Sequence, residues 1–145
     1  MADHVSKSER SRIMSLVKQK NTKPELLVRS YLHKNGLRFR LHDRRLPGSP
    51  DLVFPMYHTV VFVNGCFWHG HESSQCRRAT IPKTNEGYWR EKIANNKLRD
   101  LRNIFQLEND GWRVLVVWEC QIKQSELSLL VDTIRRNKKS DHFSY

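Results

Sequence analysis

Residues 59–71 read TVVFVNGCFWHGH, an apolar run that changes abruptly into a loop of cysteine, histidine and aromatic side chains. The first part, Thr59 to Val63, is β-branched and aromatic, which is typical of a buried strand. The polar loop that follows runs from Asn64 to about Asn85. This boundary predicts a strand whose end carries residues able to bind a metal or to react.

Strand character recurs in three other segments. The apolar residues Leu37, Phe39 and Leu41 alternate with Arg38, Arg40 and His42, which is the period of a half-buried strand. Asp51 to Phe54 follows the turn Pro47–Pro50 and predicts a short strand. WRVLVVW at Trp112–Trp118 predicts a fourth strand.

Helices are predicted before, between and after these strands. Capping-box pairs at Ser6/Glu9 and Thr22/Glu25 begin two N-terminal helices, and Asn35-Gly36 ends the second. A long helix covers about Gly87 to Asn109, and a closing helix leads into a basic tail, Arg135 to Lys139, that we expect to fray. The apolar positions of the two N-terminal helices are Ile13, Leu16 and Val17 in the first and Leu26, Leu27 and Tyr31 in the second. In the long helix they are Ile93, Leu101, Ile104 and Phe105, which we expect to lie in the core, and in the closing helix they are Leu127, Leu130, Val131 and Ile134.

The predicted order is a helix, then helix–strand–strand–strand–helix–strand, then a helix. This order predicts an α/β fold with a mixed sheet and helices on its faces, in a single domain over residues 1–145. The αβββαβ part is also the order of the PD-(D/E)xK nuclease core. Many α/β domains produce this order, so it leaves the function open.

The chain is strongly basic, with 26 Lys and Arg against 15 Asp and Glu and a formal net charge of +11. This surplus implies a polyanionic partner, and nucleic acid is the first candidate. A membrane surface and a merely basic protein, such as a ribosomal one, are the alternatives. No segment approaches the roughly 18 apolar residues of a membrane span, and MADHVSKSERSR lacks a signal-peptide core, so we expect a cytoplasmic protein with no membrane role.

The three cysteines predict a metal site rather than disulfides. An odd number of cysteines in a reducing compartment argues against a disulfide framework. Cys66, His71 and Cys76 share one loop, and Cys120 follows the last strand, so the four can meet at one end of the sheet. They form a Cys3His set suited to tetrahedral structural zinc, although buried free thiols are the alternative.

Asp51 and His69 are the candidate catalytic groups. Asp51 begins a strand beside the end of the strand that contains Val63, where a carboxylate can hold a hard cation; it is otherwise a turn residue. His69 is left over after the zinc ligands are assigned. It can take a proton from an attacking water, or be a surface histidine, or exchange roles with His71.

Two groups of residues suggest contact with DNA. Phe67 and Trp68 are adjacent loop aromatics, which either anchor the core or act as a wedge between base pairs where pairing is weak. Along the long helix, at about 100° per residue, a polar stripe lies on one side: Trp89, Lys92, Asn96 and Asp100. The stripe is either an ordinary boundary face or a DNA-facing surface that ends at the active site.

Four motifs together resemble the very short patch repair (Vsr) DNA endonucleases. They are PGSPD at Pro47–Asp51, VNGCFWHGH at Val63–His71, YWREKIANNKLRD at Tyr88–Asp100 and GWRVLVVWEC at Gly111–Cys120. The pairing of GCFWH with a distant VWEC is distinctive, and the resemblance covers about Arg10 to Cys120. It implies a PD-(D/E)xK restriction-endonuclease-like fold with structural zinc. It also implies Mg²⁺-dependent nicking of double-stranded DNA, 5′ of the thymine in T:G mismatches left by deamination of 5-methylcytosine.

The resemblance further assigns roles to single residues. In the active site, it implies that Asp51 and the Val63 carbonyl bind Mg²⁺ and that the other active-site residues are His69, Asp100, Glu25 and Asn64. It implies that the zinc ligands are Cys66, His71, Cys76 and Cys120. For DNA, it implies a minor-groove wedge at Met14, in the helix of residues 1–20, and major-groove aromatics at Phe67, Trp68 and Trp89, with Lys92 and Asn96 near the mismatch. Better-known members carry Thr and His at positions 63 and 64, and the Asn here cannot shuttle a proton.

Two rival functions are a zinc-stabilised DNA-binding module without catalysis and a restriction-like nuclease acting on matched DNA. Nicking that is lost in Asp51→Ala while binding remains would exclude the first, and a comparison of T:G with T:A duplexes would test the second. We expect a monomer, because no spare apolar helix face stands out, with mismatch-repair proteins as candidate partners.

Overall fold

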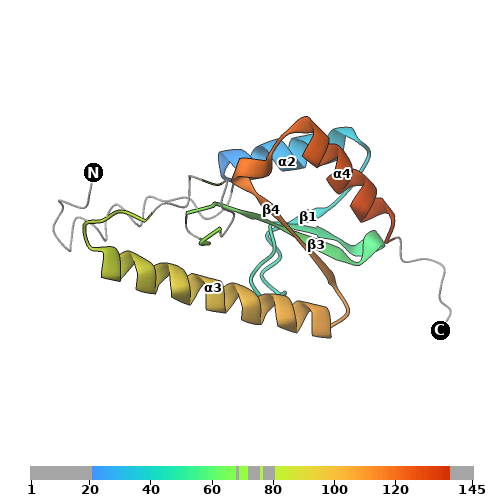
Figure 1. The fold of residues 1–145 in the computed structure, drawn as a ribbon. Coiled ribbons are helices and arrows are strands. Elements are labelled where there is room, and N and C mark those ends of the chain that lie inside the picture. The colour runs from blue at the N-terminus through green and yellow to red at the C-terminus, as the bar shows by residue number, and fades with distance from the viewer. Residues whose placement is uncertain (1–20, 68, 72–75, 77–80, 138–145) are drawn as a thin grey trace.

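The computed structural model describes residues 21–67, 69–71, 76 and 81–137, and shows a mixed four-stranded sheet between two layers of helix (Figure 1). In chain order the elements are α2 (Lys23–Lys34), β1 (Arg40–Leu41), β2 (Leu52–Phe54), the 3-10 helix η1 (Pro55–Tyr57), β3 (Thr59–Asn64), α3 (Glu86–Asn109), β4 (Arg113–Trp118), the 3-10 helix η3 (Glu119–Gln121) and α4 (Gln124–Arg135). The predicted α/β class and element order are confirmed from α2 onward. The first predicted helix with Met14, and Trp68, lie outside the described residues.

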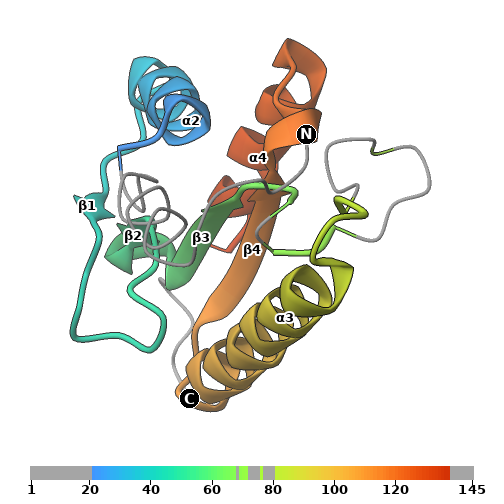
Figure 2. The same cartoon turned by 90° about the vertical axis from the view of Figure 1, so that its left-hand side faces the viewer.

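The strands lie in the order β1-β2-β3-β4. β2 pairs antiparallel with both β1 and β3, whereas β3 pairs parallel with β4. A parallel neighbour needs a crossover connection, which here contains α3 (Figure 2). The β3–β4 register sets Asn64 opposite Trp118, so the two strands end side by side. The polar segments that follow them therefore begin at the same edge of the sheet.

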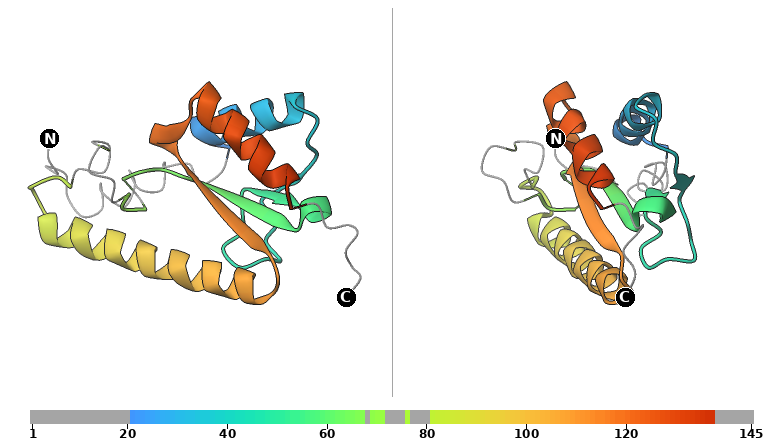
Figure 3. Two further views of the ribbon diagram at one scale, coloured as in Figure 1. Left: turned by 45° about the vertical axis from the view of Figure 1, so that its right-hand side comes forward. Right: turned by 90° about the vertical axis from the view of Figure 1, so that its right-hand side faces the viewer.

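Helices cover both faces of the sheet, with α2 and α4 on one face and α3 on the other (Figure 3). This double cover explains why β2 is buried at every residue and the first half of β3 is equally buried. The core on the α2/α4 side comprises Val28, Leu32, Leu37, Leu52, Phe54, Val61, Leu127, Leu130, Val131 and Ile134. The smaller core on the α3 side comprises Val53, Val60 and Leu107.

The predicted apolar face of α2 is wrong in part. Tyr31 packs against the core, but Leu26 and Leu27 are 43% and 50% exposed. The helical period instead turns Val28 and Leu32 inward, together with Glu25. The buried face was not recognised in the sequence because it contains the charged residue Glu25.

The core stripe predicted for α3 is wrong at two of its four positions. Ile93 is buried as expected, but Leu101 and Phe105 are 63% and 71% exposed. The inward stripe contains Asn96 and Asp100, because this side of the helix meets the loop after β3 as well as the sheet. Leu98 is also exposed, so α3 does carry a spare apolar stripe, which removes the reason given for expecting a monomer.

Two smaller corrections concern the ends of elements. β1 has only two residues, and Leu41 is exposed because β1 is an edge strand. The expected fraying from Arg135 is wrong as far as Asn137, whose side-chain amide donates to the carbonyl of Tyr57 at 2.7 Å. Among the helices of the described ranges, none has the length and apolar character needed to cross a membrane.

Candidate active site and metal centre

An open cavity of about 480 Å³ lies between the β1–β2 connection and α3, with strand residues forming its floor. It brings together five residues that the sequence singled out: Asp51, Val63, Asn64, His69 and Asp100. These five come from β3, α3 and the two loops next to strand ends, and up to 49 positions separate them in the chain. The predicted meeting of Asp51 with His69 at a strand tip is therefore present.

Asp51 is fixed by the β2–β3 pairing. Because Leu52 pairs with Val61, Asp51 reaches the end of β3, where the backbone N–H of Val63 donates to its Oδ2 at 2.7 Å. Burial raises the pKa of Asp51 from 3.8 to about 6, and the negative charge of Glu25 adds to the rise. The Val63 N–H and the nearby His42 and His69 act in the opposite direction. A cation bound at this carboxylate would relieve the cost of keeping it charged.

His69 and Asp100 form a close pair in the cavity lining. His69 Nδ1 lies 2.6 Å from Asp100 Oδ2, and each side chain is about one third exposed. In the tautomer with the proton on Nδ1, Nδ1–H donates to the Asp100 carboxylate and Nε2 is left as a proton acceptor. The pair thus has the arrangement of an oriented general base.

The loop can approach α3 this closely because residue 70 is glycine. Gly70 has a φ of +61°, and a Cβ there would lie 2.6 Å from Ile93 Cγ2 and 2.7 Å from Lys97 Cδ. Both the backbone conformation and the contact exclude other residues without a shift. Gly70 therefore helps to set the distance over which His69 meets Asp100.

Glu25 is placed differently from the other predicted active-site residues. It is 1% exposed and is not among the residues that line the cavity. His42, which does line the cavity, lies 2.6 Å from Glu25 through its Nε2. The ligand atoms of Glu25, His42 and Asp51 all lie within 4.8 Å of one another.

Sequence reasoning gave no site role to eight of the cavity residues, among them His42, Arg44 and Asn103, whose polar side chains are able to contact DNA or the other site residues. His42 was interpreted only as the polar partner in an alternating strand. Its position at the end of that strand, next to the edge where Asp51 begins another, was the available signal. No sequence pattern around Asn103 indicated a site residue, because its place in the cavity depends on the packing of α3 against Gly48.

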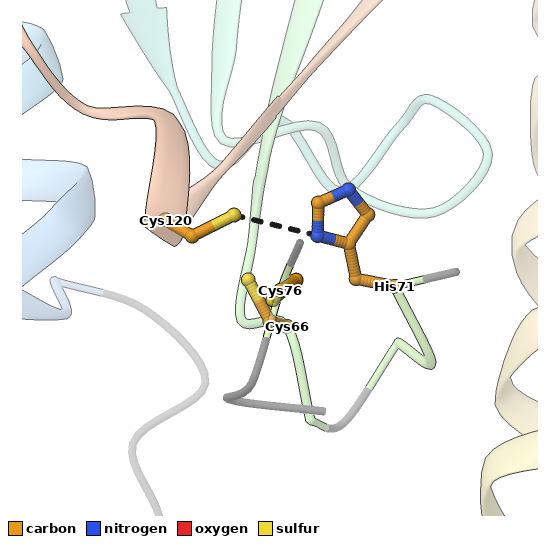
Figure 4. A group of neighbouring side chains, drawn as sticks. All are labelled: Cys66, His71, Cys76 and Cys120. Carbon is orange, nitrogen blue, oxygen red and sulfur yellow. Dashed lines mark hydrogen bonds between the residues drawn. The ribbon is translucent and has the colours of Figure 1, made fainter. Parts of the chain in front are cut away.

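Cys66, His71, Cys76 and Cys120 converge on one point, as predicted (Figure 4). Their ligand atoms all lie within 4.8 Å of one another, and Cys120 Sγ is 3.4 Å from His71 Nδ1. In tetrahedral zinc the ligand atoms are separated by roughly 3.5–3.8 Å, given Zn–N and Zn–S bonds near 2.0 and 2.3 Å. The donor set and its size therefore suit zinc.

The sheet explains why these four residues meet. Cys66 and Cys120 each lie two residues beyond the paired ends of β3 and β4. The backbone N–H of Cys66 donates to Glu119 Oε1 at 3.2 Å, and the His71 ring stacks on Trp118 at 4.1 Å. Burial raises the pKa of Cys66 to about 12, and the neighbouring thiols add to the rise. A cation bound among these ligands would offset this cost and let the Cys66 thiol ionise.

The structure also locates four predicted DNA-contact residues. Phe67 and Trp89 pack edge to face with ring centroids 5.6 Å apart, so the loop aromatic meets the start of α3. Lys92 is partly buried and Asn96 is buried, and the two ends of the same stripe, Trp89 and Asp100, contact the loop after β3. Their roles at a mismatch stay predictions, as do those of Met14 and Trp68.

Comparison with known proteins supports the resemblance seen in the motifs. The family model described as DNA mismatch endonuclease Vsr matches residues 2–75. A type II nicking enzyme of Xanthomonas oryzae pv. oryzae is 48% identical over 135 residues, which cover 93% of this chain and 96% of that protein. A type II nicking enzyme of Neisseria meningitidis is 46% identical, covering 88% and 89% of the two chains. The DNA mismatch endonuclease Vsr of Escherichia coli is 43% identical, covering 87% and 79%.

These similarities extend over most of the chain and include the segments that build the cavity and the cysteine–histidine cluster. Residues 2–75 contain Asp51, His69 and the first zinc-type ligands, and the relatives extend the match beyond them. The chain therefore belongs to the Vsr DNA mismatch endonuclease family and is a DNA endonuclease of the nicking type.

Proposed function

We propose that this protein cuts one strand of double-stranded DNA on the 5′ side of the thymine in a T:G mismatch. The cut would start very short patch repair of deaminated 5-methylcytosine in the bacterial cytoplasm. The observation that carries the proposal is the meeting of Asp51 with the His69–Asp100 pair in one open cavity. The relatives are named as a mismatch endonuclease and as type II nicking enzymes, which supports strand nicking. The specificity for a T:G mismatch is the part that the experiment below tests.

The floor of the cavity fits magnesium. Asp51 offers a carboxylate and Val63 a backbone carbonyl, and oxygen ligands of this kind suit a hard cation. Magnesium bound there would neutralise charge on the phosphate and make a neighbouring water more acidic. Asn64 is buried beside these ligands and supplies an amide for hydrogen bonding.

The protein's own residues then handle the proton. His69, with Nε2 as the acceptor, takes the proton from the attacking water. Asp100, at 2.6 Å from Nδ1, holds the ring in position and stabilises the imidazolium that forms. Glu25 contributes from behind the cavity wall, since it is buried and next to His42.

The Cys3His set is proposed to hold structural zinc. A bound zinc ion would tie the loop after β3 to the end of β4 and so fix His69, which lies between Cys66 and His71. All four sites of a tetrahedral ion would be filled by protein, which is the pattern of structural rather than catalytic zinc.

DNA binding would combine charge with aromatic insertion. The net charge of +11 supplies salt-dependent affinity for phosphates. Phe67, Trp68 and Trp89, with Met14 from the N-terminal segment, would enter the base stack beside the mismatch, with Lys92 and Asn96 nearby. Unstacking costs least where pairing is already poor, so insertion favours a mismatched site.

The test uses three otherwise identical duplexes carrying T:G, T:A or C:G at one position, each strand labelled separately. We expect nicking of the thymine strand of the T:G duplex only, dependent on Mg²⁺ and absent in Asp51→Ala, whose DNA binding remains. Equal cutting of T:A would favour a restriction-like nuclease. Tight binding of T:G without any cutting by the wild type would favour a binding module.

A further inference from the structure

The buried carboxylate of Glu25 is fully engaged by the protein. Its Oε1 accepts from the backbone N–H of Asn21 at 2.9 Å, and its Oε2 accepts from Arg29 at 2.9 Å and from His42 Nε2 at 2.6 Å. Arg29 and Asn21 are absent from the cavity lining, and so is Glu25. His42 is the one partner of Glu25, among the described residues, that also faces the cavity.

His42 is held in an unusual backbone conformation. Its φ of +47° lies in the left-handed region, which a residue with a Cβ enters at a cost. Its backbone N–H donates to the carbonyl of Asp51 at 3.1 Å. His42 thus contacts Glu25 with its ring and Asp51 with its backbone, and joins α2 to the strand that carries the predicted metal ligand.

Two histidine–carboxylate pairs therefore lie near Asp51. His69 with Asp100 forms one pair and His42 with Glu25 the other, each with a 2.6 Å contact. Both imidazoles line the cavity, whereas Glu25 lies behind its imidazole. Groups that orient the ligands of a cation site typically change metal affinity or activity by roughly 10–100-fold when they are removed.

We propose that His42 is a positioning residue through which Glu25 acts on the active site, and that it holds Asp51 in place for the cation. The inference rests on the proposed function, because it takes Asp51 as the cation ligand. Glu25 accordingly needs no direct contact with the cation or with DNA. Its hydrogen-bonded link to the cavity runs through the ring at position 42.

Two substitutions of His42 distinguish the effect of its side chain from the effect of its left-handed backbone conformation. Asparagine tolerates the left-handed conformation but is too short to reach Glu25, whereas glutamine keeps a side-chain N–H donor with the longer reach. We expect His42→Asn to lower kcat or raise the half-saturating Mg²⁺ concentration by roughly 10–100-fold. His42→Gln should stay within about threefold of wild type in both quantities, because the donor to Glu25 is kept.

A double-mutant cycle tests whether the two residues act as one unit. If Glu25 acts through His42, Glu25→Gln combined with His42→Asn should be no worse than the more damaging single change. Arg29→Ala is the matched control, because it removes a 2.9 Å bond to the same oxygen on the side away from the cavity. It should lower Tm yet leave nicking within about twofold of wild type.

The outcomes distinguish this inference from the function on which it rests. The inference is overturned if folded His42→Asn nicks like wild type at all Mg²⁺ concentrations. It is also overturned if glutamine fails to restore activity, or if the double change multiplies the two single effects. The proposed function itself fails if wild type shows no Mg²⁺-dependent nicking or if Asp51→Ala retains it.

Discussion

Asp51→Asn should make the metal-free protein more stable at pH 8 while abolishing nicking. Burial raises the pKa of Asp51 from 3.8 to about 6. Between these two values the folded state binds more protons than the unfolded chain, so stability falls as pH rises through this window and stays lower above it. The ionised carboxylate therefore costs the metal-free protein roughly 3 kcal/mol at pH 8. Asparagine removes this cost and still offers an oxygen to the Val63 N–H.

The net gain is smaller than the full cost, because a neutral acceptor binds the Val63 N–H less strongly than a charged one. We expect a net stabilisation of about 1–3 kcal/mol at pH 8. In a protein of 145 residues this corresponds to a rise in Tm of roughly 3–9 °C. The advantage of Asp51→Asn at pH 8 should exceed that at pH 5 by about 1.4 kcal/mol, since the carboxyl is largely protonated in the folded state at pH 5.

The assay is urea unfolding of wild type and Asp51→Asn at pH 5 and pH 8 without divalent cations other than bound zinc. Comparing the two proteins at each pH removes effects that they share. Added Mg²⁺ should raise the stability of wild type only. An advantage that is absent at pH 8, or equal at both pH values, would contradict the buried, costly carboxylate inferred for Asp51.

Three further predictions concern the metal cluster, the loop and the cavity rim. Cys120→Ser should lower bound zinc, measured by mass spectrometry of the native protein, from about one ion per chain and destabilise folding by several kcal/mol; unchanged zinc content would exclude Cys120 as a ligand. Gly70→Ala should cost about 1–3 kcal/mol in urea unfolding and reduce nicking, since its Cβ meets Ile93 at 2.6 Å and its φ is +61°; wild-type stability would show that the loop can move away from α3. Arg44 lines the cavity without a hydrogen-bond or ion-pair partner among the described residues, so Arg44→Ala should reduce the salt slope of DNA binding by about 1. Arg45→Ala, which removes an exposed arginine already paired with a carboxylate, is the matched control, and equal slopes in the two variants would refute a phosphate contact at Arg44.

Much of the architecture is readable in the sequence because it depends on local patterns. The capping residue Thr22 accepts from the Glu25 N–H at the start of α2, and the apolar run at 59–63 is β3. The Cys3His set was also predictable, because ligand chemistry depends on residue type and two of its members follow strands directly. The capping box is only half present, since Glu25 reaches back to Asn21 instead of Thr22.

The sequence by itself thus determined the helices, the strands and the chemical types of residue that gather at the site. Only the tertiary structure decided that the polar stripe of α3 faces inward and its leucine–phenylalanine stripe outward, and that Glu25 reaches the cavity through His42. Local sequence patterns reflect the conformational preferences of segments a few residues long. The inward face of a helix and the partner of a buried carboxylate depend instead on contacts between segments far apart in the chain, such as His69 and Asp100, which are 31 positions apart.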